Sequence, residues 1–192
     1  MKKPAVFLDR DGTINEQMGY INHISRFVLL PGVSGAIREL NRMGYHVIVL
    51  SNQSGVARGY FPIQLVEQVN LLMKRALEEK GALLDAVYFC PHYPKGTVRP
   101  YAGECDCRKP KTGLIDLACN DFEIDLKGSF MVGDRCDDIK MAVSAGIRGI
   151  LVKSGYGKGE VEHVLPKMNF EPFYIAEDLP DAVNRIKSAG DR

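Results

Sequence analysis

The sequence lacks the features that mark several large classes of protein. Its 192 residues carry a formal net charge of only +1, and without a basic excess to neutralise a phosphate backbone a nucleic-acid-binding role is disfavoured. No apolar run approaches the roughly 18 residues that a membrane span needs. No segment is repeated, of low complexity or linker-like. We therefore expect a single domain over residues 1–192, acting as a monomer without a nucleic-acid or membrane partner.

A secretion signal is also missing, and cysteines are few. Met1-Lys2-Lys3-Pro4 leads straight into an apolar segment, with no separate signal region and no small-residue cleavage site. We therefore expect a cytoplasmic protein. Its five cysteines are odd in number, which in such a chain suggests thiols or metal ligands rather than disulfides.

Short apolar runs alternate with segments of helical spacing along the chain. Strands are expected at residues 5–8, 46–50, 86–90, 130–132, 149–152 and 173–175. Helices are expected at residues 33–43, 63–80, 113–120, 139–145 and 179–187. This alternation indicates a doubly wound α/β fold, a parallel sheet with helices on both faces. In such sheets ligands bind beyond the carboxyl ends of the strands.

Polar residues follow three of these strands, and a fourth polar group precedes a helix. The four groups are Asp9-Arg10-Asp11, Ser51 to Gly55, Arg108-Lys109-Pro110 and Gly133 to Asp138. Each alone is typical of a turn, a cap or a solvated face. Asp11 before Gly12 would also fit a hairpin turn, but no alternating strand follows it. Occurring together at strand ends, the groups predict one shared site.

In this order, Asp-x-Asp, Ser, Lys and Gly-Asp-x-x-x-Asp resemble the four motifs of the haloacid dehalogenase superfamily. Its members are mostly phosphatases that work through an aspartyl-phosphate on a Rossmann-like sheet. The resemblance implies that Asp9 is nucleophile and Mg²⁺ ligand, and that Asp134 is a further ligand. It implies that Asp11 serves as acid and then base, while its carbonyl also binds the metal. Magnesium suits this chemistry, because it neutralises a phosphate that would otherwise repel the attacking carboxylate.

The other motif residues are expected to hold the phosphate and the metal site in place. Ser51 and Lys109 would bind the phosphoryl oxygens, over which charge spreads during transfer. Asp138, or alternatively Asp137, would orient the residues that bind the metal without binding it directly.

A second metal site is indicated by cysteine and histidine spacing. Cys90 and His92 are followed, after twelve residues, by Cys105 and Cys107, and three thiols with one imidazole suit tetrahedral Zn²⁺. The alternative, buried free cysteines beside a surface histidine, has no periodic support in this loop. Four protein ligands leave no open position, so we expect a structural zinc that fixes the loop at 90–107 next to the Lys109 motif.

The remaining cysteines and histidines are expected to be structural. They are Cys119, Cys136, His23, His46 and His163.

No segment between the motifs is long enough for a large cap domain, so we expect an open site bounded by loops. Two cap-less groups of the superfamily carry a zinc loop, the heptose bisphosphate phosphatases and the histidinol-phosphate phosphatases. Gly19-Tyr20-Ile21, the segment 51–59 and the long interval from His92 to Cys105 resemble the heptose enzymes. The resemblance implies D-glycero-D-manno-heptose 1,7-bisphosphate as substrate, losing its C7 phosphate to give heptose 1-phosphate for lipopolysaccharide core or nucleotide-heptose synthesis.

The expected substrate contacts lie on four segments of the chain. They are Gly19, Tyr20, Ser51, Asn52, Gln53, Ser54, Arg108, Lys109 and Arg135. A bisphosphate carries up to four charges, and Arg108, Lys109 and Arg135 supply cations beyond what one phosphate and magnesium require. We expect Arg108 to recognise the phosphate that is retained.

Three other interpretations remain open. A histidinol-phosphate phosphatase would share the whole mechanism. A receiver domain of a signalling pathway also forms an aspartyl-phosphate, but it would carry its nucleophile at the end of the third strand, where this chain has Cys90. A non-catalytic sugar-phosphate-binding protein would have no need of Asp11.

Overall fold

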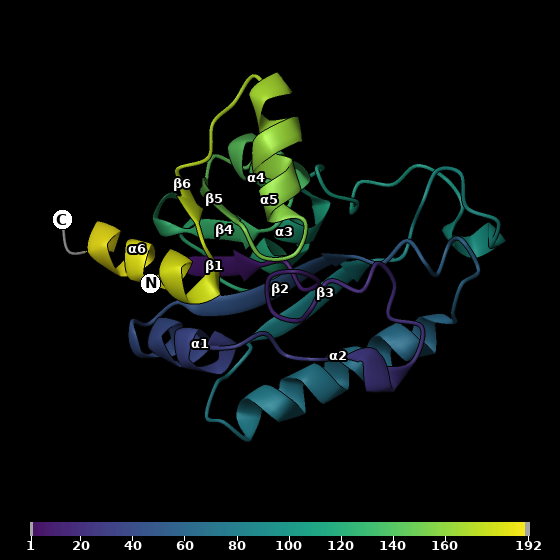
Figure 1. Ribbon diagram of the computed structural model, residues 1–192, viewed down its shortest axis with the longest axis horizontal. Coiled ribbons are helices and arrows are strands. Elements are labelled where there is room, and N and C mark those ends of the chain that lie inside the picture. The colour runs from purple at the N-terminus through teal and green to yellow at the C-terminus, as the bar shows by residue number, and fades with distance from the viewer. Residues whose placement is uncertain (1, 191–192) are drawn as a thin grey trace.

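The computed structural model describes residues 2–190 and contains one six-stranded parallel sheet in the order β3-β2-β1-β4-β5-β6 (Figure 1). The strands are β1 (Ala5–Leu8), β2 (His46–Asn52), β3 (Ala86–Cys90), β4 (Phe130–Gly133), β5 (Arg148–Val152) and β6 (Tyr174–Ala176). The helices are α1 (Val33–Arg42), α2 (Ile63–Glu78), α3 (Gly113–Asp121), α4 (Cys136–Ser144), α5 (Gly157–Gly159) and α6 (Leu179–Gly190). Shorter 3-10 turns cover Ile24–Arg26, Arg99–Tyr101, Leu126–Gly128 and Leu165–Lys167, and a π-helical turn covers Glu160–Val164.

The central strand β1 explains why the sheet forms. All four of its residues are fully buried and apolar, as expected for a parallel strand covered on both faces. It pairs in parallel with both neighbours, so that Phe7 lies opposite Ile48 of β2 and Met131 of β4. The order places β1 at the centre of a doubly wound sheet, and the predicted fold class is confirmed.

Helices cover both faces of the sheet, and each face has its own apolar core. Val6 and Leu8 pack into the core beneath α1 and α6, whereas Ala5 and Phe7 pack into the core beneath α3 and α4. This division follows from the alternation of side chains along a strand. Figure 1 shows α1 and α2 on one side of the sheet and α3 and α4 on the other.

Several element ends differ from those expected. Helix α4 begins at Cys136, three residues before the predicted start, because the Asp138 carboxylate accepts a hydrogen bond from the backbone N–H of Arg135 and caps the first turn. Strand β2 continues to Asn52, two residues beyond its predicted end. Within residues 2–190, no helix has the length and apolar character to cross a membrane.

Candidate active site

The polar groups that follow β1, β2 and β4 meet at one edge of the sheet. These three strands are parallel neighbours, so their carboxyl ends lie side by side. A pocket at this edge is lined by Asp9, Asp11, Ser51 and Lys109, which come from three separate segments. Every predicted substrate contact except Gln53 also lines it. The rule that ligands bind beyond the carboxyl ends of the strands, called the strand-end rule below, therefore brings these residues to one pocket.

Three buried carboxylates cluster at the pocket, and two of them, Asp9 and Asp138, line it. Asp9, Asp134 and Asp138 each offer an oxygen within 4.8 Å of the others. Burial, together with the nearby charges of Asp9 and Asp138, raises the pKa of Asp134 to about 8. Burial also raises the pKa of Asp9 to about 6, although Lys109 opposes the shift. Such a cluster is costly without a cation to neutralise it.

The donor set fits magnesium. Asp134 Oδ2 accepts a hydrogen bond of 2.8 Å from the backbone N–H of Tyr156. Its Oδ1 is buried and has no hydrogen-bond partner within residues 2–190. A buried carboxylate oxygen without a donor, next to two further acids, is the arrangement that a hard, oxygen-seeking cation satisfies.

Lys109 is the cation that the cluster already contains. Its ammonium donates to Asp9 Oδ1 at 2.5 Å and to the Leu50 carbonyl at 2.8 Å, and it lies 2.7 Å from Asp138 Oδ1. Burial alone would lower the pKa of Lys109, but the charges of Asp138 and Asp9 outweigh it and raise the pKa. Lys109 therefore stays charged in a fully enclosed position.

Asn52 fixes the backbone of Lys109. Its side-chain Oδ1 accepts from the Lys109 N–H at 3.1 Å, and its Nδ2 donates to the Lys109 carbonyl at 3.2 Å. The two residues are 57 positions apart. The end of β2 thereby holds the segment that presents the lysine.

Asp11 has a separate set of partners. Arg10 Nη2 donates to both of its carboxylate oxygens, at 2.7 and 3.0 Å, and Asn15 Nδ2 donates to Oδ1 at 3.0 Å. Burial would raise the pKa of Asp11, but the Arg10 charge and the hydrogen bonds from Asn15, Arg10 and Gln53 lower it below the ordinary value. The backbone carbonyl of Asp11 accepts a hydrogen bond from Gln17 Nε2 at 3.1 Å.

Gln53 is not among the residues that line the pocket, but its side chain binds two residues that do, and its predicted contact with substrate stays a prediction. Its Nε2 donates to Asp11 Oδ2 at 2.8 Å and to Ser51 Oγ at 2.7 Å. Because a carboxylate only accepts, the nitrogen of the amide must face Asp11. Ser51 Oγ is then an acceptor for Gln53, which leaves the hydroxyl proton free to donate into the pocket.

The structure also distinguishes the two candidate supporting acids. Asp138 is buried and contacts Lys109, whereas Asp137 is exposed at the pocket rim. Asp138 is the acid that supports the site. Its oxygen also lies close enough to Asp9 and Asp134 to share their cation.

Comparisons with known proteins identify the family. The HAD-hydrolase-like family matches residues 106–182. A D-glycero-D-manno-heptose-1,7-bisphosphate 7-phosphatase of Thermosynechococcus vestitus is 44% identical and covers 97% of this chain and 96% of its own. A D-glycero-beta-D-manno-heptose-1,7-bisphosphate 7-phosphatase of Escherichia coli K12 is 38% identical, with coverages of 96% and 94%.

A solved structure agrees with these relatives. The D,D-heptose 1,7-bisphosphate phosphatase of B. bronchiseptica, complexed with magnesium and phosphate, is 31% identical, has a TM-score of 0.84 and covers 98% of this chain and 99% of its own. This chain belongs to the heptose-bisphosphate phosphatase family. The resemblance implied by the four motifs is confirmed.

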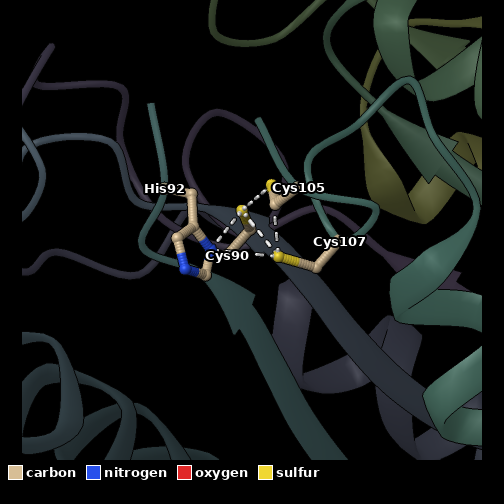
Figure 2. Close-up of side chains that lie close together, drawn as sticks. All are labelled: Cys90, His92, Cys105 and Cys107. Atoms are coloured by element: carbon tan, nitrogen blue, oxygen red, sulfur yellow. Dashed lines mark hydrogen bonds between the residues drawn. The ribbon is translucent and has the colours of Figure 1, made fainter. Parts of the chain in front are cut away.

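This member of the heptose-bisphosphate phosphatase family brings its four predicted zinc ligands together (Figure 2). Cys105 Sγ lies 3.6 Å from both Cys90 Sγ and Cys107 Sγ, and these two lie 3.0 Å apart. His92 Nδ1 lies 3.7 Å from Cys90 Sγ and 3.4 Å from Cys107 Sγ. A tetrahedral zinc with Zn–S bonds of about 2.3 Å requires ligand separations of about 3.7 Å. The four residues therefore fit the predicted metal.

The hydrogen bonding of the thiols is consistent with such a site. Hydrogen bonding to the Cys90 thiol lowers the pKa of Cys107 to about 5, whereas the same contact raises the pKa of Cys90. One member of the group is therefore readily ionised, as a zinc ligand must be. Cys119 and Cys136 stand outside the cluster, as expected. His46 also lies outside the cluster, and its Nδ1 lies 2.9 Å from Asp85 Oδ1.

The loop at 90–107 carries the four predicted zinc ligands and is called the zinc loop below. It also helps to shape the wall of the pocket. Arg108 Nη1 donates to the carbonyl of the cluster residue His92 at 3.4 Å, and its guanidinium lies 5.4 Å from the centre of the Tyr93 ring. Arg58, from the loop after β2, lies 3.7 Å above the same ring. On the loop after β1, the Tyr20 ring meets Tyr60 edge to face at 4.9 Å. Contacts between aromatic and cationic side chains thus join three loops.

A fourth loop, after β5, was missed by the sequence analysis. Ser154 Oγ donates to the Gly12 carbonyl at 2.6 Å, and Tyr156 lines the pocket with its ring 5.0 Å from the Arg135 guanidinium. Gly155 between them has a φ of +57°, and a Cβ there would lie 2.2 Å from Asp134 Oδ2. Only glycine allows this approach. The strand-end rule, applied to β5, would have found the loop.

Proposed function

We propose that this protein is a magnesium-dependent phosphatase that removes the C7 phosphate of D-glycero-D-manno-heptose 1,7-bisphosphate. The observation that carries the proposal is that one pocket contains two acids whose pKa values are shifted in opposite directions. Asp9 lies beside Lys109, and Asp11 lies beside Arg10. A protein that only bound phosphate would need neither a nucleophile nor an acid-base group. The names of the relatives supply the substrate.

Asp9, Asp134 and the backbone carbonyl of Asp11 would hold the magnesium. When bound, the ion neutralises the phosphate charge that would otherwise repel a carboxylate nucleophile. Asp138 supports this arrangement by holding Lys109 against Asp9.

In the first step, an Asp9 oxygen forms a bond to phosphorus while the bond from phosphorus to the sugar oxygen breaks. Asp11 gives a proton to that leaving oxygen, which departs as an alcohol. The product on the protein is an aspartyl-phosphate at Asp9. The low pKa of Asp11 makes its proton, once it carries one, easy to release.

In the second step, a water oxygen attacks the phosphorus and the bond to Asp9 breaks. Asp11 takes a proton from this water, for which its low pKa keeps it in the required anionic form. Inorganic phosphate leaves, and Asp9 regains its carboxylate.

The phosphoryl oxygens are held through both steps by Ser51 and Lys109. The free hydroxyl proton of Ser51 and the ammonium of Lys109 lie where charge spreads during transfer. Arg108 on the zinc loop would bind the retained phosphate, with Arg135 as a second cation on the rim. The zinc would be structural, and the monomeric state and cytoplasmic location are predictions from the sequence.

The test is phosphate release by the magnesium-loaded protein from both anomers of heptose 1,7-bisphosphate and from histidinol phosphate. We expect one heptose anomer to have the highest kcat/KM, and Asp9→Asn to abolish release. A preference for histidinol phosphate would contradict the substrate and keep the mechanism. A long-lived phosphoprotein without release would instead favour the receiver-domain interpretation.

A further inference from the structure

Arg10 lies between the two catalytic acids of the proposed mechanism, but its side chain serves only the second. It is 1% exposed. Its Nη2 binds both oxygens of Asp11. Its Nη1 donates at 2.9 Å to the side-chain oxygen of Asn70, which lies in the middle of α2 and 60 positions along the chain. The arginine thus joins the acid-base group to a helix that covers the sheet (Figure 1).

From this geometry we infer that Asn70 is a positioning residue, which acts through Arg10 to hold the Asp11 carboxylate at the pocket wall. The inference rests on the proposed role of Asp11 as acid and base. Asn70 does not line the pocket and so acts at a distance from any substrate.

The hydrogen bonding of Arg10 explains why the distant amide matters. A buried guanidinium needs acceptors for its donors, and a donor without an acceptor is costly. Arg10 Nε already has no hydrogen-bond partner within residues 2–190. Without the Asn70 oxygen, Nη1 would lose its acceptor as well, and the guanidinium would have to turn to find another. Because Nη2 belongs to the same rigid plane, such a turn would move the donors that Asp11 now accepts from.

A purely structural role for Asn70 is less well supported. Helix α2 is already held by four buried apolar side chains, Val66, Val69, Met73 and Leu77. Losing one hydrogen bond from its side would leave that packing in place. The contact between Asn70 and Arg10 is therefore better explained as holding Asp11 in place than as holding α2 in place.

The test compares three single variants on α2. Asn70→Leu keeps the size of the side chain and removes the acceptor, whereas Asn70→Asp keeps an acceptor of the same length. Gln68→Leu, at an exposed position on the same helix, is the matched control. We would measure steady-state kcat and KM on heptose 1,7-bisphosphate and on p-nitrophenyl phosphate. Rapid mixing would also give the first-turnover burst of p-nitrophenolate, a leaving group that needs no proton.

We expect Asn70→Leu to lower steady-state kcat about tenfold, part of the ~10²–10⁴-fold that an acid-base group supplies, with KM changed less than about twofold. The p-nitrophenolate burst rate should stay at the level of the unaltered protein, because formation of the aspartyl-phosphate from this ester needs Asp9 but no acid. Asn70→Asp should restore turnover, and Gln68→Leu should leave it unchanged.

Two results would overturn the inference. One is normal turnover in Asn70→Leu, and the other is a burst slowed as much as turnover, which would indicate general damage to the site. If the unaltered protein hydrolysed p-nitrophenyl phosphate but not the heptose bisphosphate, the proposed substrate would fail. The burst and turnover of Asn70→Leu on the aryl ester would still decide the role of Asn70.

Discussion

Lys109 is the residue on which the geometry of the candidate site depends most. It is 4% exposed, and its ammonium joins Asp9 to Asp138 and to the main chain at Leu50. When one partner of a buried ion pair is removed, the other is left as an uncompensated buried charge. That charge destabilises the fold by more than the intact pair stabilised it. Here the loss would leave two acids facing each other. The lysine therefore balances charge among these acids, and in the proposed mechanism it also binds the phosphoryl oxygens.

Replacing Lys109 with methionine should lower kcat about 10²–10³-fold, since one preorganised donor to a developing charge is removed. Steady-state phosphate release measures this effect. Lys111→Met is the matched control, because Lys111 is two residues away and half-exposed, and its ammonium contacts the zinc loop through two exposed acids and the Cys105 carbonyl. Equal losses in the two variants would show that charge in the loop, rather than the buried ammonium, is what matters.

At the scale of residues, the sequence predicted which groups meet but not all of their roles. The strand-end rule brought Asp9 and Ser51 to one pocket, with Asp134 next to Asp9. It could not show that the Gln53 side chain binds Asp11 and Ser51, because side-chain hydrogen bonds between separate segments are not visible in the sequence. Nor could it show the burial of Lys109, since a Lys-Pro pair in a polar loop is usually solvated.

At the scale of elements, the zinc loop is the part of the site with the least support from apolar packing. It connects β3 to α3, and the 3-10 turn at Arg99–Tyr101 has no buried residue. Cys90 ends β3, and Cys107 directly precedes Arg108 and Lys109. A metal at this cluster would tie the strand to the segment that carries both cations, in place of a hydrophobic core.

Cys107→Ser should therefore lose zinc and weaken substrate binding. We expect the metal content to fall well below one zinc per chain, measured by elemental analysis. We also expect kcat/KM for the bisphosphate to fall about tenfold or more, or about 1.4 kcal/mol of transition-state stabilisation. Cys119→Ser, a thiol on α3 outside the cluster, should keep both values. Normal activity in a zinc-free Cys107→Ser protein would rule out this role for the metal.

In the described part of the chain, the element type was predicted for every strand and for every α-helix except α5, whereas several ends and one loop were not predicted. The helix expected from Ile139 begins at Cys136, because a side-chain cap satisfies the first turn in a way that apolar spacing does not reveal. The loop of Ser154 to Tyr156 carries no charge and only one short polar side chain, so no motif marked it. Its contribution comes from the Ser154 hydroxyl, which donates to the Gly12 carbonyl, from the Tyr156 backbone N–H, which donates to Asp134, and from the close approach of Gly155.

At the scale of the whole molecule, the buried acids of the site lower the stability of the folded state. Three acids are buried together at the centre of the sheet edge, where Lys109 neutralises only part of their charge. Carboxylates in such a place bind protons more tightly when the chain is folded than when it is unfolded. Catalysis requires the ionised forms, so without a cation the folded protein favours protonated acids that the proposed mechanism needs as anions.

This conflict predicts that the magnesium-free protein loses stability as the pH rises. Burial raises the pKa of Asp134 from an ordinary 3.8 to about 8, so between these values the folded chain holds a proton that the unfolded chain has lost. The free energy of unfolding should then fall with pH, by up to about 1.4 kcal/mol per pH unit for one proton.

Urea unfolding of zinc-loaded protein between pH 5.5 and 8 would measure this slope. Asp134→Asn, which cannot ionise, should flatten it, and magnesium should stabilise the unaltered protein most at the alkaline end, where Asp134 is an anion able to bind it. A slope that is the same in Asp134→Asn would place the proton on another group. It would also remove the argument that Asp134 is held in a protonated form until magnesium displaces the proton.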